Sequence, residues 1–199
     1  MSRVIYLLRH GQTEFNAELR MQGHCDSPLT EQGVAQAHAM GATLREDVSN
    51  PADWQVLASP LGRAMQTAQL VCQELGLPHS CIRAEPRLIE VCFGEWEKKQ
   101  VEILRLQYPE LNGVPDWYFQ APDCEPYAAV VQRIENWLAD TELPARLIVV
   151  AHGLLGRILR GVYAGLTPEQ LWQQDMPQDA FFRLQNGMIT RISCAQFAN

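Results

Sequence analysis

The chain alternates short apolar runs with longer amphipathic segments, a pattern typical of α/β proteins. The short runs predict strands over 3–8, 55–58, 81–84 and 146–151. The amphipathic segments predict helices over 30–49, 59–75, 98–108, 127–139, 154–163 and 168–173. Because strands that alternate with helices usually pair in parallel, we predict a three-layer α/β/α sandwich with a mainly parallel sheet.

Two segments depart from this alternation. Ala180–Leu184 and Met188–Ser193 flank an Asn-Gly turn at 185–187, which predicts a hairpin that adds an antiparallel edge to the sheet. Residues 97–126 combine one helical stretch with a loop rich in Pro, which predicts a small lid insert over the strand ends. The length of 199 residues then suits a single domain over 1–199 that carries this insert.

Breakers and caps limit the predicted elements. Asn50-Pro51 ends the first helix, and Ser59-Pro60 is expected to cap the second. Residues 12–28 and 85–96 lack a periodic pattern and are predicted as loops.

Charge and composition narrow the classes of partner. The chain has 16 Lys and Arg against 23 Asp and Glu, a net charge of −7. This excess of negative charge argues against nucleic acid and anionic membranes as partners. A small anionic substrate is still compatible with this net charge, because a local cluster of arginines can attract an anion to a protein that is negative overall.

The chain is expected to be cytoplasmic. Its apolar runs, such as Leu147–Ala151, are far too short to span a bilayer. The apolar run near the N-terminus meets Arg9-His10 before a signal sequence is complete. The six cysteines form no CxxC pair, and in such a compartment we expect them to be reduced.

Two of the five histidines follow predicted strands directly. His10 follows the first strand and His152 follows the strand at 146–151, and a glycine comes after each. Arg9 precedes His10, and Arg63 lies near the start of the helix that follows the second strand. The carboxyl ends of parallel strands meet at one edge of a sheet, so we expect these four side chains to converge. Arginine forks match phosphate oxygens, and a neutral imidazole is a competent nucleophile toward phosphorus.

Five ordered segments resemble motifs of the histidine phosphatase superfamily, the phosphoglycerate-mutase-like enzymes. They cover nearly the whole chain and lie at 8–16 (LRHGQTEFN), 22–33 (QGHCDSPLTEQG), 58–68 (ASPLGRAMQTA), 88–97 (LIEVCFGEWE) and 149–153 (VVAHG). In size and motifs the chain looks most like the α-ribazole phosphatase and broad-specificity phosphatase branch. The resemblance implies phosphoryl transfer that needs no metal or other cofactor, because positive side chains neutralise the phosphate.

The resemblance also implies a role for each matching residue. His10 would be the nucleophile that is transiently phosphorylated, with Arg9, Arg63 and His152 holding the phosphoryl charge. Glu90 would protonate the leaving oxygen and then deprotonate the attacking water. The expected substrate-binding residues are Arg9, Asn16, Gln22, Gly23, Arg63, His152, Gly153 and Leu154, the last through its backbone N–H.

The expected activity is hydrolysis of a small phosphorylated metabolite through a phosphohistidine at His10. One alternative is a mutase that returns the phosphoryl group to a second hydroxyl of the same substrate. Another is an inactive relative that only binds phosphorylated ligands. The chain departs from the family pattern at Lys98-Lys99 and at 121–127, within the insert. The identity of the substrate and the oligomeric state therefore remain open.

Several other residues have two interpretations. Lys98, Lys99 and Arg105 either attract an anionic group or form a solvated helix face, and the second is favoured. Trp96, Trp117, Tyr118 and Phe119 either line a substrate pocket or pack in the core or lid. The cluster His24-Cys25-Asp26 has a spacing unsuited to metal ligation on one rigid element, so it is interpreted as a polar loop.

Overall fold

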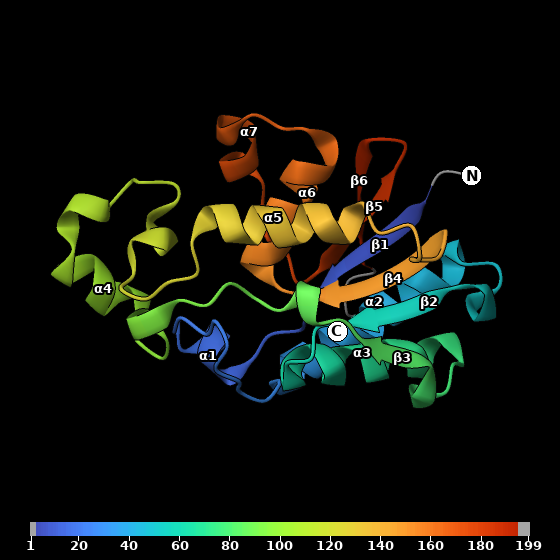
Figure 1. Cartoon of the computed structure of the whole chain (residues 1–199). Helices are drawn as coiled ribbons and strands as arrows, with labels where there is room; N and C mark the ends of the chain where they lie inside the picture. The colour runs from blue at the N-terminus through green and yellow to red at the C-terminus, as the bar shows by residue number, and fades with distance from the viewer. Residues whose placement is uncertain (1–2, 195–199) are drawn as a thin grey trace.

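A computed structural model describes residues 3–194 and places a six-stranded sheet at the centre of the molecule (Figure 1). The strand order is β3-β2-β4-β1-β5-β6. The strands are β1 (Val4–Arg9), β2 (Gln55–Ala58), β3 (Ile82–Ala84), β4 (Arg146–Ala151), β5 (Ala180–Gln185) and β6 (Met188–Ser193). β1 to β4 run parallel, whereas β5 pairs antiparallel with β1 and β6 antiparallel with β5. The mainly parallel sheet with an antiparallel hairpin edge is therefore confirmed.

The two central strands carry the residues that form the site. Both β1 and β4 are buried on their two faces, which explains why their sequences are continuously apolar. Arg9 pairs with Ala151 in the parallel register, and His10 N–H donates to the Ala151 carbonyl at 3.0 Å. His10 and His152 consequently lie one residue beyond paired strand ends, at the same edge of the sheet.

Helices cover both faces of the sheet, which completes the three layers (Figure 1). α2 (Glu31–Asp47) and α3 (Gly62–Leu75) pack on one face, where Tyr6 and Leu8 of β1 are buried. On the opposite face Ile5 and Leu7 of the same strand are buried. The helices there are α5 (Tyr127–Leu138), α6 (Gly153–Ala164) and α7 (Pro168–Gln173).

Three predicted boundaries were wrong. The predicted loop at 12–28 contains a short helix, α1 (Glu14–Ala17), which Thr13 and Asn16 stabilise by a reciprocal capping box. Ser59 does not cap α3, since the N-cap is Leu61 and the Ser59 hydroxyl is bonded to His152 instead. The helix expected over 98–108 begins only at Val101, because Lys98 has a left-handed backbone with φ of 68°.

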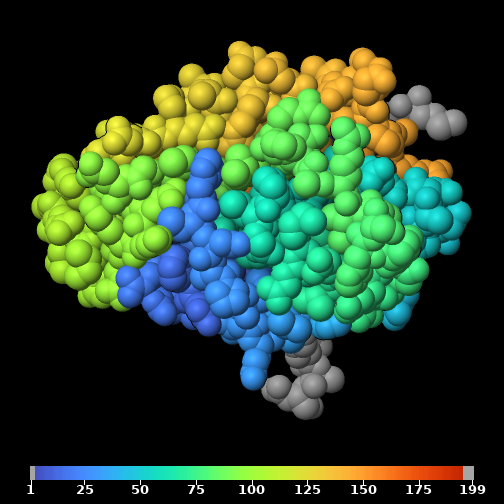
Figure 2. Space-filling view, turned by 60° about the horizontal axis from the view of Figure 1, so that its bottom comes forward, coloured from blue at the N-terminus to red at the C-terminus, as the bar shows by residue number. Residues whose placement is uncertain are grey.

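The insert forms one end of the molecule, on the side toward which β1 and β4 point (Figure 1). It contains α4 (Val101–Gln107) and is drawn yellow-green, beside the blue N-terminal segment, in Figure 2. Backbone hydrogen bonds join the two segments, from Met21 N–H to the Lys99 carbonyl and from Lys98 N–H to the Met21 carbonyl. Within 3–194, none of the helices is both long and apolar enough to cross a membrane.

Candidate active site

His10 is held in one tautomer at the carboxyl end of β1. The ring is buried, with 3% of the residue's surface exposed. Its Nδ1 lies 2.8 Å from the Gly11 carbonyl oxygen, an acceptor, so Nδ1 carries the proton. Its Nε2 accepts a hydrogen bond from Arg63 Nε at 3.2 Å. The lone pair needed for attack on phosphorus is therefore on Nε2, beside a guanidinium that can bind the phosphate.

The surroundings keep His10 neutral. Burial lowers its pKa well below the ordinary value, and the positive charges of Arg63 and Arg9 lower it further. A neutral imidazole retains the Nε2 lone pair, whereas a protonated ring has none to donate. The site thus maintains the nucleophilic form of the ring even in mildly acidic solution.

The His152 ring packs against the His10 ring. The two ring centroids are 5.2 Å apart and the rings are tilted by 63°. His152 Nε2 shares a hydrogen bond of 2.7 Å with the Ser59 hydroxyl, and Nδ1 has no partner within residues 3–194. Burial lowers the pKa of His152 well below its ordinary value, with further contributions from Arg63, His10 and Arg9. The predicted convergence of the two histidines is confirmed.

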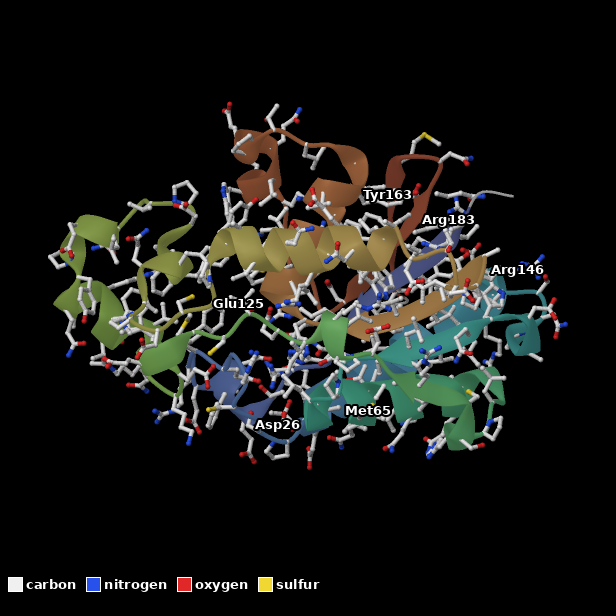
Figure 3. The ribbon with its side chains drawn as sticks, viewed as in Figure 1. Asp26, Met65, Glu125, Arg146, Tyr163 and Arg183 are labelled. Carbon is white, nitrogen blue, oxygen red and sulfur yellow. The ribbon has the colours of Figure 1, made fainter. Side chains whose placement is uncertain are left out.

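Arg63 extends from the first turn of α3 into the site, where it is only 1% exposed. Its Nη2 donates to the Gly23 carbonyl at 2.8 Å and its Nη1 to the Cys25 carbonyl at 2.8 Å. Asp26 (labelled in Figure 3) accepts from Nη1 at 3.2 Å. The 22–28 loop therefore fixes the orientation of the guanidinium toward His10.

Arg9 supplies a second cation, half-buried as a residue but with its Nε shielded from solvent. Its Nη1 donates to the Met176 carbonyl at 2.5 Å, while its Nε has no partner in the described part of the chain. Burial lowers its pKa to about 10, so it remains charged at neutral pH. An unpaired N–H on a buried guanidinium is suited to bind an anionic oxygen.

Glu90 is held at the N-terminus of α6. Its carboxylate accepts hydrogen bonds from the N–H groups of Val91 at 3.0 Å, Leu154 at 3.2 Å and Leu155 at 2.9 Å. Leu154 N–H, expected to contact the phosphate, is therefore engaged by Glu90 in this structure. The free amides of a helix N-terminus stabilise negative charge, which explains how an acid only 7% exposed is accommodated here.

Most of the predicted site residues line one cavity of about 120 Å³. Its walls include Arg9, His10, Asn16, Gln22, Gly23, Arg63, Glu90, Gly153 and Leu154, all predicted from the sequence. His152 packs against the His10 ring at the edge of this set, and its buried Nδ1 has no hydrogen-bond partner within residues 3–194. Five further residues complete the lining: Arg20, Met21, Phe93, Tyr118 and Met176. Arg9, Arg20 and Arg63, a neutral histidine and a buried carboxylate thus line one small cavity, an arrangement suited to phosphoryl transfer.

A model of the histidine phosphatase superfamily (branch 1) matches residues 5–188. The chain belongs to this superfamily. A probable phosphoglycerate mutase, GpmB, of an Enterobacter species is 35% identical over 196 residues, covering 94% of this chain and 83% of that protein. The corresponding GpmB of Salmonella arizonae is 33% identical with the same coverage.

Solved structures of similar chains support the same membership. A putative alpha-ribazole-5'-P phosphatase from Escherichia coli superposes with a TM-score of 0.79 at 27% identity, covering 100% of this chain and 99% of that one. A mycobacterial glucosyl-3-phosphoglycerate phosphatase superposes with a TM-score of 0.74 at 25% identity, with 100% of both chains covered. These relatives are named as phosphatases or mutases, so membership of the superfamily supports the prediction that the chain is an enzyme.

Sequence reasoning missed two residues that organise this histidine phosphatase site. Gln178 Nε2 donates to the His10 carbonyl at 3.1 Å and to Asn16 Oδ1 at 3.2 Å, which leaves the Asn16 amide nitrogen to serve as a donor. Ser59 orients His152. Gln178 lies in an irregular segment between α7 and β5, where no motif identifies it, whereas Ser59 falls inside a matching segment.

Other candidate residues lie outside the catalytic cavity. Lys98 and Lys99 are exposed and do not line it. The His24 ring is bonded to the Glu90 carbonyl and the Cys25 thiol to Glu97, so the polar loop has separate structural partners. Across residues 3–194, no group of three or more His, Cys, Asp or Glu side chains is placed to hold a metal ion. All six cysteines are free thiols.

Gly23→Ala is expected to lower both stability and activity. Gly23 has φ of 55°, and an added Cβ would lie 2.1 Å from Glu97 Oε1. The Glu97 carboxylate must move away from its hydrogen bonds with the His24 and Phe93 N–H groups, and the positive φ adds strain at the residue whose carbonyl holds Arg63. We expect a loss of roughly 1–3 kcal/mol in the free energy of unfolding and of about 10²-fold in kcat/KM on an aryl phosphate.

Gly76→Ala is the matched control for this substitution. Gly76 also has a positive φ, 69°, but an added Cβ would have no neighbour within 4 Å, and the residue lies at the far end of α3. It should lose some stability and keep its activity. Equal kcat/KM values for the Gly23→Ala variant and wild type would contradict the assigned role of the Gly23 carbonyl.

The free energy of unfolding should fall as the pH drops below about 6.5. Both buried histidines have folded-state pKa values well below those of an unfolded chain. The unfolded chain therefore binds protons that the folded chain does not, which favours unfolding from pH 6.5 down to the folded-state pKa values. Each histidine contributes at most about 1.4 kcal/mol per pH unit.

Urea denaturation at several pH values, with His10→Asn compared with wild type, measures this contribution. The variant should show a shallower pH dependence between pH 6.5 and 5.5. His79→Asn, which replaces an exposed histidine, provides the control. Identical slopes for wild type and His10→Asn would show that His10 is not held neutral by the fold.

Proposed function

We propose that this histidine phosphatase hydrolyses phosphomonoesters through a phosphohistidine on His10. The observation that carries the proposal is the His10 Nε2 lone pair, directed at Arg63 Nε at 3.2 Å beside a cavity lined by Arg9 and Glu90. Phosphate oxygens compete with that lone pair for the N–H groups of Arg63. Nε2 is released by this exchange and faces the phosphorus.

In the first step, Nε2 forms a bond to phosphorus while the bond from phosphorus to the ester oxygen breaks. Arg9 and Arg63 stabilise the charge on the nonbridging oxygens, and Glu90 protonates the departing alkoxide. His152, packed against His10, supports the position of the ring. In the second step Glu90 takes a proton from water, the oxygen attacks phosphorus, and the P–N bond breaks to regenerate His10.

The competing activity is a mutase, as the names of the GpmB relatives suggest. A mutase must exclude water from the phosphoenzyme and retain its intermediate. In the second step described above, water alone accepts the phosphoryl group from His10. We therefore propose hydrolysis rather than transfer to a second hydroxyl of the substrate.

Two assays on the purified chain separate the activities. The first measures phosphate release from a panel of phosphomonoesters. The second measures conversion of 3-phosphoglycerate to its 2-isomer after priming with 2,3-bisphosphoglycerate. Phosphate release without isomerisation supports the proposal, whereas isomerisation that exceeds phosphate release would overturn it.

Metal chelation is expected to leave the activity unchanged. Charge on the phosphoryl group is neutralised in the proposed mechanism by Arg9 and Arg63, which line the cavity from two elements. The measurement is kcat/KM on an aryl phosphate before and after dialysis against EDTA. A loss of activity that added divalent ions restore would contradict this mechanism.

A further inference from the structure

Arg160 is a buried cation that is not among the residues lining the catalytic cavity. It lies on α6, is only 3% exposed, and stacks on Phe182 with its Cζ 3.8 Å from the ring centroid. Burial lowers its pKa to about 10, so it remains charged at neutral pH. Burying a charge costs free energy that an apolar side chain of similar size would avoid. What the guanidinium contributes must therefore lie in the groups that it holds.

The Arg160 guanidinium holds the backbone of a loop. Its Nε donates to the Gly156 carbonyl of the same helix at 3.3 Å, and its Nη2 donates to the Asp175 carbonyl at 2.5 Å. Asp175 lies in the irregular segment between α7 and β5. Within residues 3–194, the N–H and C=O groups of 175–178 make no hydrogen bond to another backbone group. The position of this segment therefore depends on side-chain contacts such as that of Arg160.

The next carbonyl along the chain holds Arg9. The Met176 carbonyl accepts the hydrogen bond from Arg9 Nη1, and this is the one hydrogen bond that the Arg9 guanidinium makes within the described residues. Both arginines and Met176 also line one narrow cavity of about 20 Å³, which places the two guanidiniums near one another. A displacement of the Asp175 carbonyl would move Met176 as well, and with it the direction in which Arg9 presents its N–H groups.

We propose that Arg160 is a positioning residue for phosphoryl transfer, which orients Arg9 by fixing the consecutive carbonyls of Asp175 and Met176. The proposal rests on the proposed function, because that function assigns Arg9 to the phosphoryl oxygens. A shift of about 1 Å in a group that positions the substrate can lower the rate by about 10²-fold. Small movements of the 175–178 segment therefore affect catalysis although Arg160 itself does not line the catalytic cavity.

Arg160→Lys and Arg160→Met test the contact with the Asp175 carbonyl. The lysine ammonium keeps the charge but lies one bond short of Nη2, and methionine fills the space without a donor. Each should lower kcat/KM on an aryl phosphate by about 10- to 10²-fold. Each should also raise the Kd for inorganic phosphate, measured by calorimetry, by about tenfold. If either variant is folded, as urea denaturation measures, and binds phosphate as tightly as wild type, the proposal is overturned.

Asp175→Asn is the matched control, because it keeps the carbonyl and removes only the side-chain charge. The carboxylate is half-exposed and lies 3.7 Å from Arg160 Nη1 and 3.2 Å from Arg191 Nε, so these ion pairs are expected to contribute little. The variant should keep the activity and the phosphate affinity of wild type. A loss equal to that of Arg160→Lys would assign the effect to the ion pair and contradict the role of the carbonyl.

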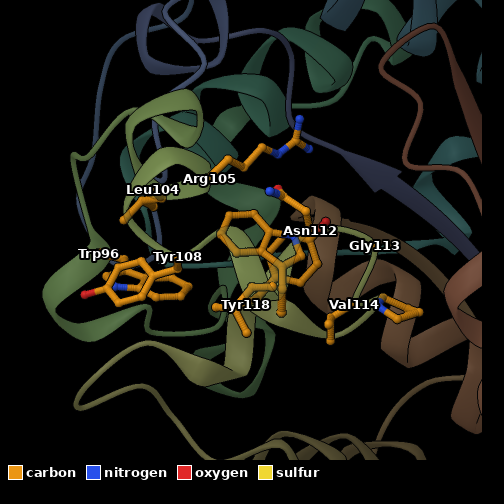
Figure 4. Close-up of a pocket in the computed structure, with 11 residues that line it drawn as sticks. Trp96, Leu104, Arg105, Tyr108, Asn112, Gly113, Val114 and Tyr118 are labelled. Atoms are coloured by element: carbon orange, nitrogen blue, oxygen red, sulfur yellow. The ribbon is translucent and has the colours of Figure 1, made fainter.

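These substitutions leave the insert unchanged. Figure 4 shows its cavity of about 420 Å³, whose lining residues all lie between 96 and 118. Within the described chain, changes at positions 160 and 175 therefore replace none of its walls. An altered activity in these variants reports on the 175–178 segment and not on the insert.

A double variant separates positioning from general support of the fold. In the wild-type background Arg160→Lys should cost about 10- to 10²-fold in kcat/KM. In the Arg9→Met background, which has no guanidinium to orient, the same substitution should cost less than about threefold. Equal fold losses in the two backgrounds would show that Arg160 supports only the fold, and would overturn the proposal.

The phosphate titrations distinguish a failure of this proposal from a failure of the proposed function. If wild type binds phosphate but hydrolyses no phosphomonoester, the proposed function fails, and the phosphate Kd of the Arg160 variants still decides whether Arg160 positions Arg9. If wild type is an active phosphatase and the Arg160 variants match it, the role of Arg160 alone is overturned. A wild-type chain that binds no phosphate would overturn both.

Discussion

His10→Ala is expected to lower kcat/KM on every phosphomonoester by on the order of 10⁴-fold or more. The substitution removes the Nε2 lone pair that lies 3.2 Å from Arg63 Nε, and with it the atom that forms the covalent bond to phosphorus. The neighbouring imidazole, His152, has its Nε2 bonded to the Ser59 hydroxyl at 2.7 Å. It is not placed to replace His10. Steady-state assays on an aryl phosphate measure the loss.

The control is His38→Ala. His38 lies on α2, where its Nδ1 is paired with Glu74 at 2.8 Å on the side of the sheet that α2 and α3 cover. This variant should retain wild-type activity. A circular dichroism spectrum of His10→Ala that matches wild type shows that the loss is chemical rather than structural. An active His10→Ala enzyme would contradict the proposed nucleophile.

Position at the ends of elements identified the four residues at the centre of this site, whereas the resemblance to the family identified others, including Glu90 and Asn16. His10 and His152 could be predicted to converge because the carboxyl ends of parallel strands lie at the same edge of a sheet. In the structure Arg9 pairs with Ala151, so the residues that follow them, His10 and His152, lie side by side. Arg63 could be predicted because it lies near the start of α3. Each of these predictions depends on local position in an element.

The contacts that the sequence did not reveal join segments far apart in the chain. Gln178 reaches back to the His10 carbonyl, 168 positions away, across a loop that has no regular structure. Leu154 N–H was expected at the phosphate and is bonded to Glu90, a loop residue 64 positions earlier. Pairing of this kind depends on how loops fold over the sheet, which no periodic pattern encodes.

The fold was predicted well where hydrophobic spacing decides the element. The central strands and the long helices bury apolar residues at regular intervals, so their periodicity is strong. α1 was missed because its four residues, Glu14–Ala17, bury none of their side chains and are held by the Thr13 cap. Short elements that are stabilised by hydrogen bonds leave little apolar signal.

Glu90→Gln is expected to lower kcat/KM by about 10²–10⁴-fold on an alkyl phosphate and much less on 4-nitrophenyl phosphate. An alkoxide is a poor leaving group and needs a proton, whereas nitrophenolate leaves without one. Glutamine has the shape of glutamic acid and cannot transfer that proton.

The contrast between the two substrates separates catalysis from structure. Glu90 also accepts hydrogen bonds from Leu154 and Leu155 at the start of α6, and loss of that support would affect every substrate alike. Equal reductions on both substrates would therefore contradict the role of general acid. The ratio kcat/KM is the proper measure because it reports on steps up to formation of the phosphoenzyme.

Trapping of the phosphoenzyme tests the central claim most directly. Enzyme mixed with a ³²P-labelled phosphomonoester is quenched within the first turnover, and the labelled peptide is identified by mass spectrometry. We predict a label that is stable in base, labile in acid and located on His10. A label that survives acid, or one on any residue other than His10, would contradict the account.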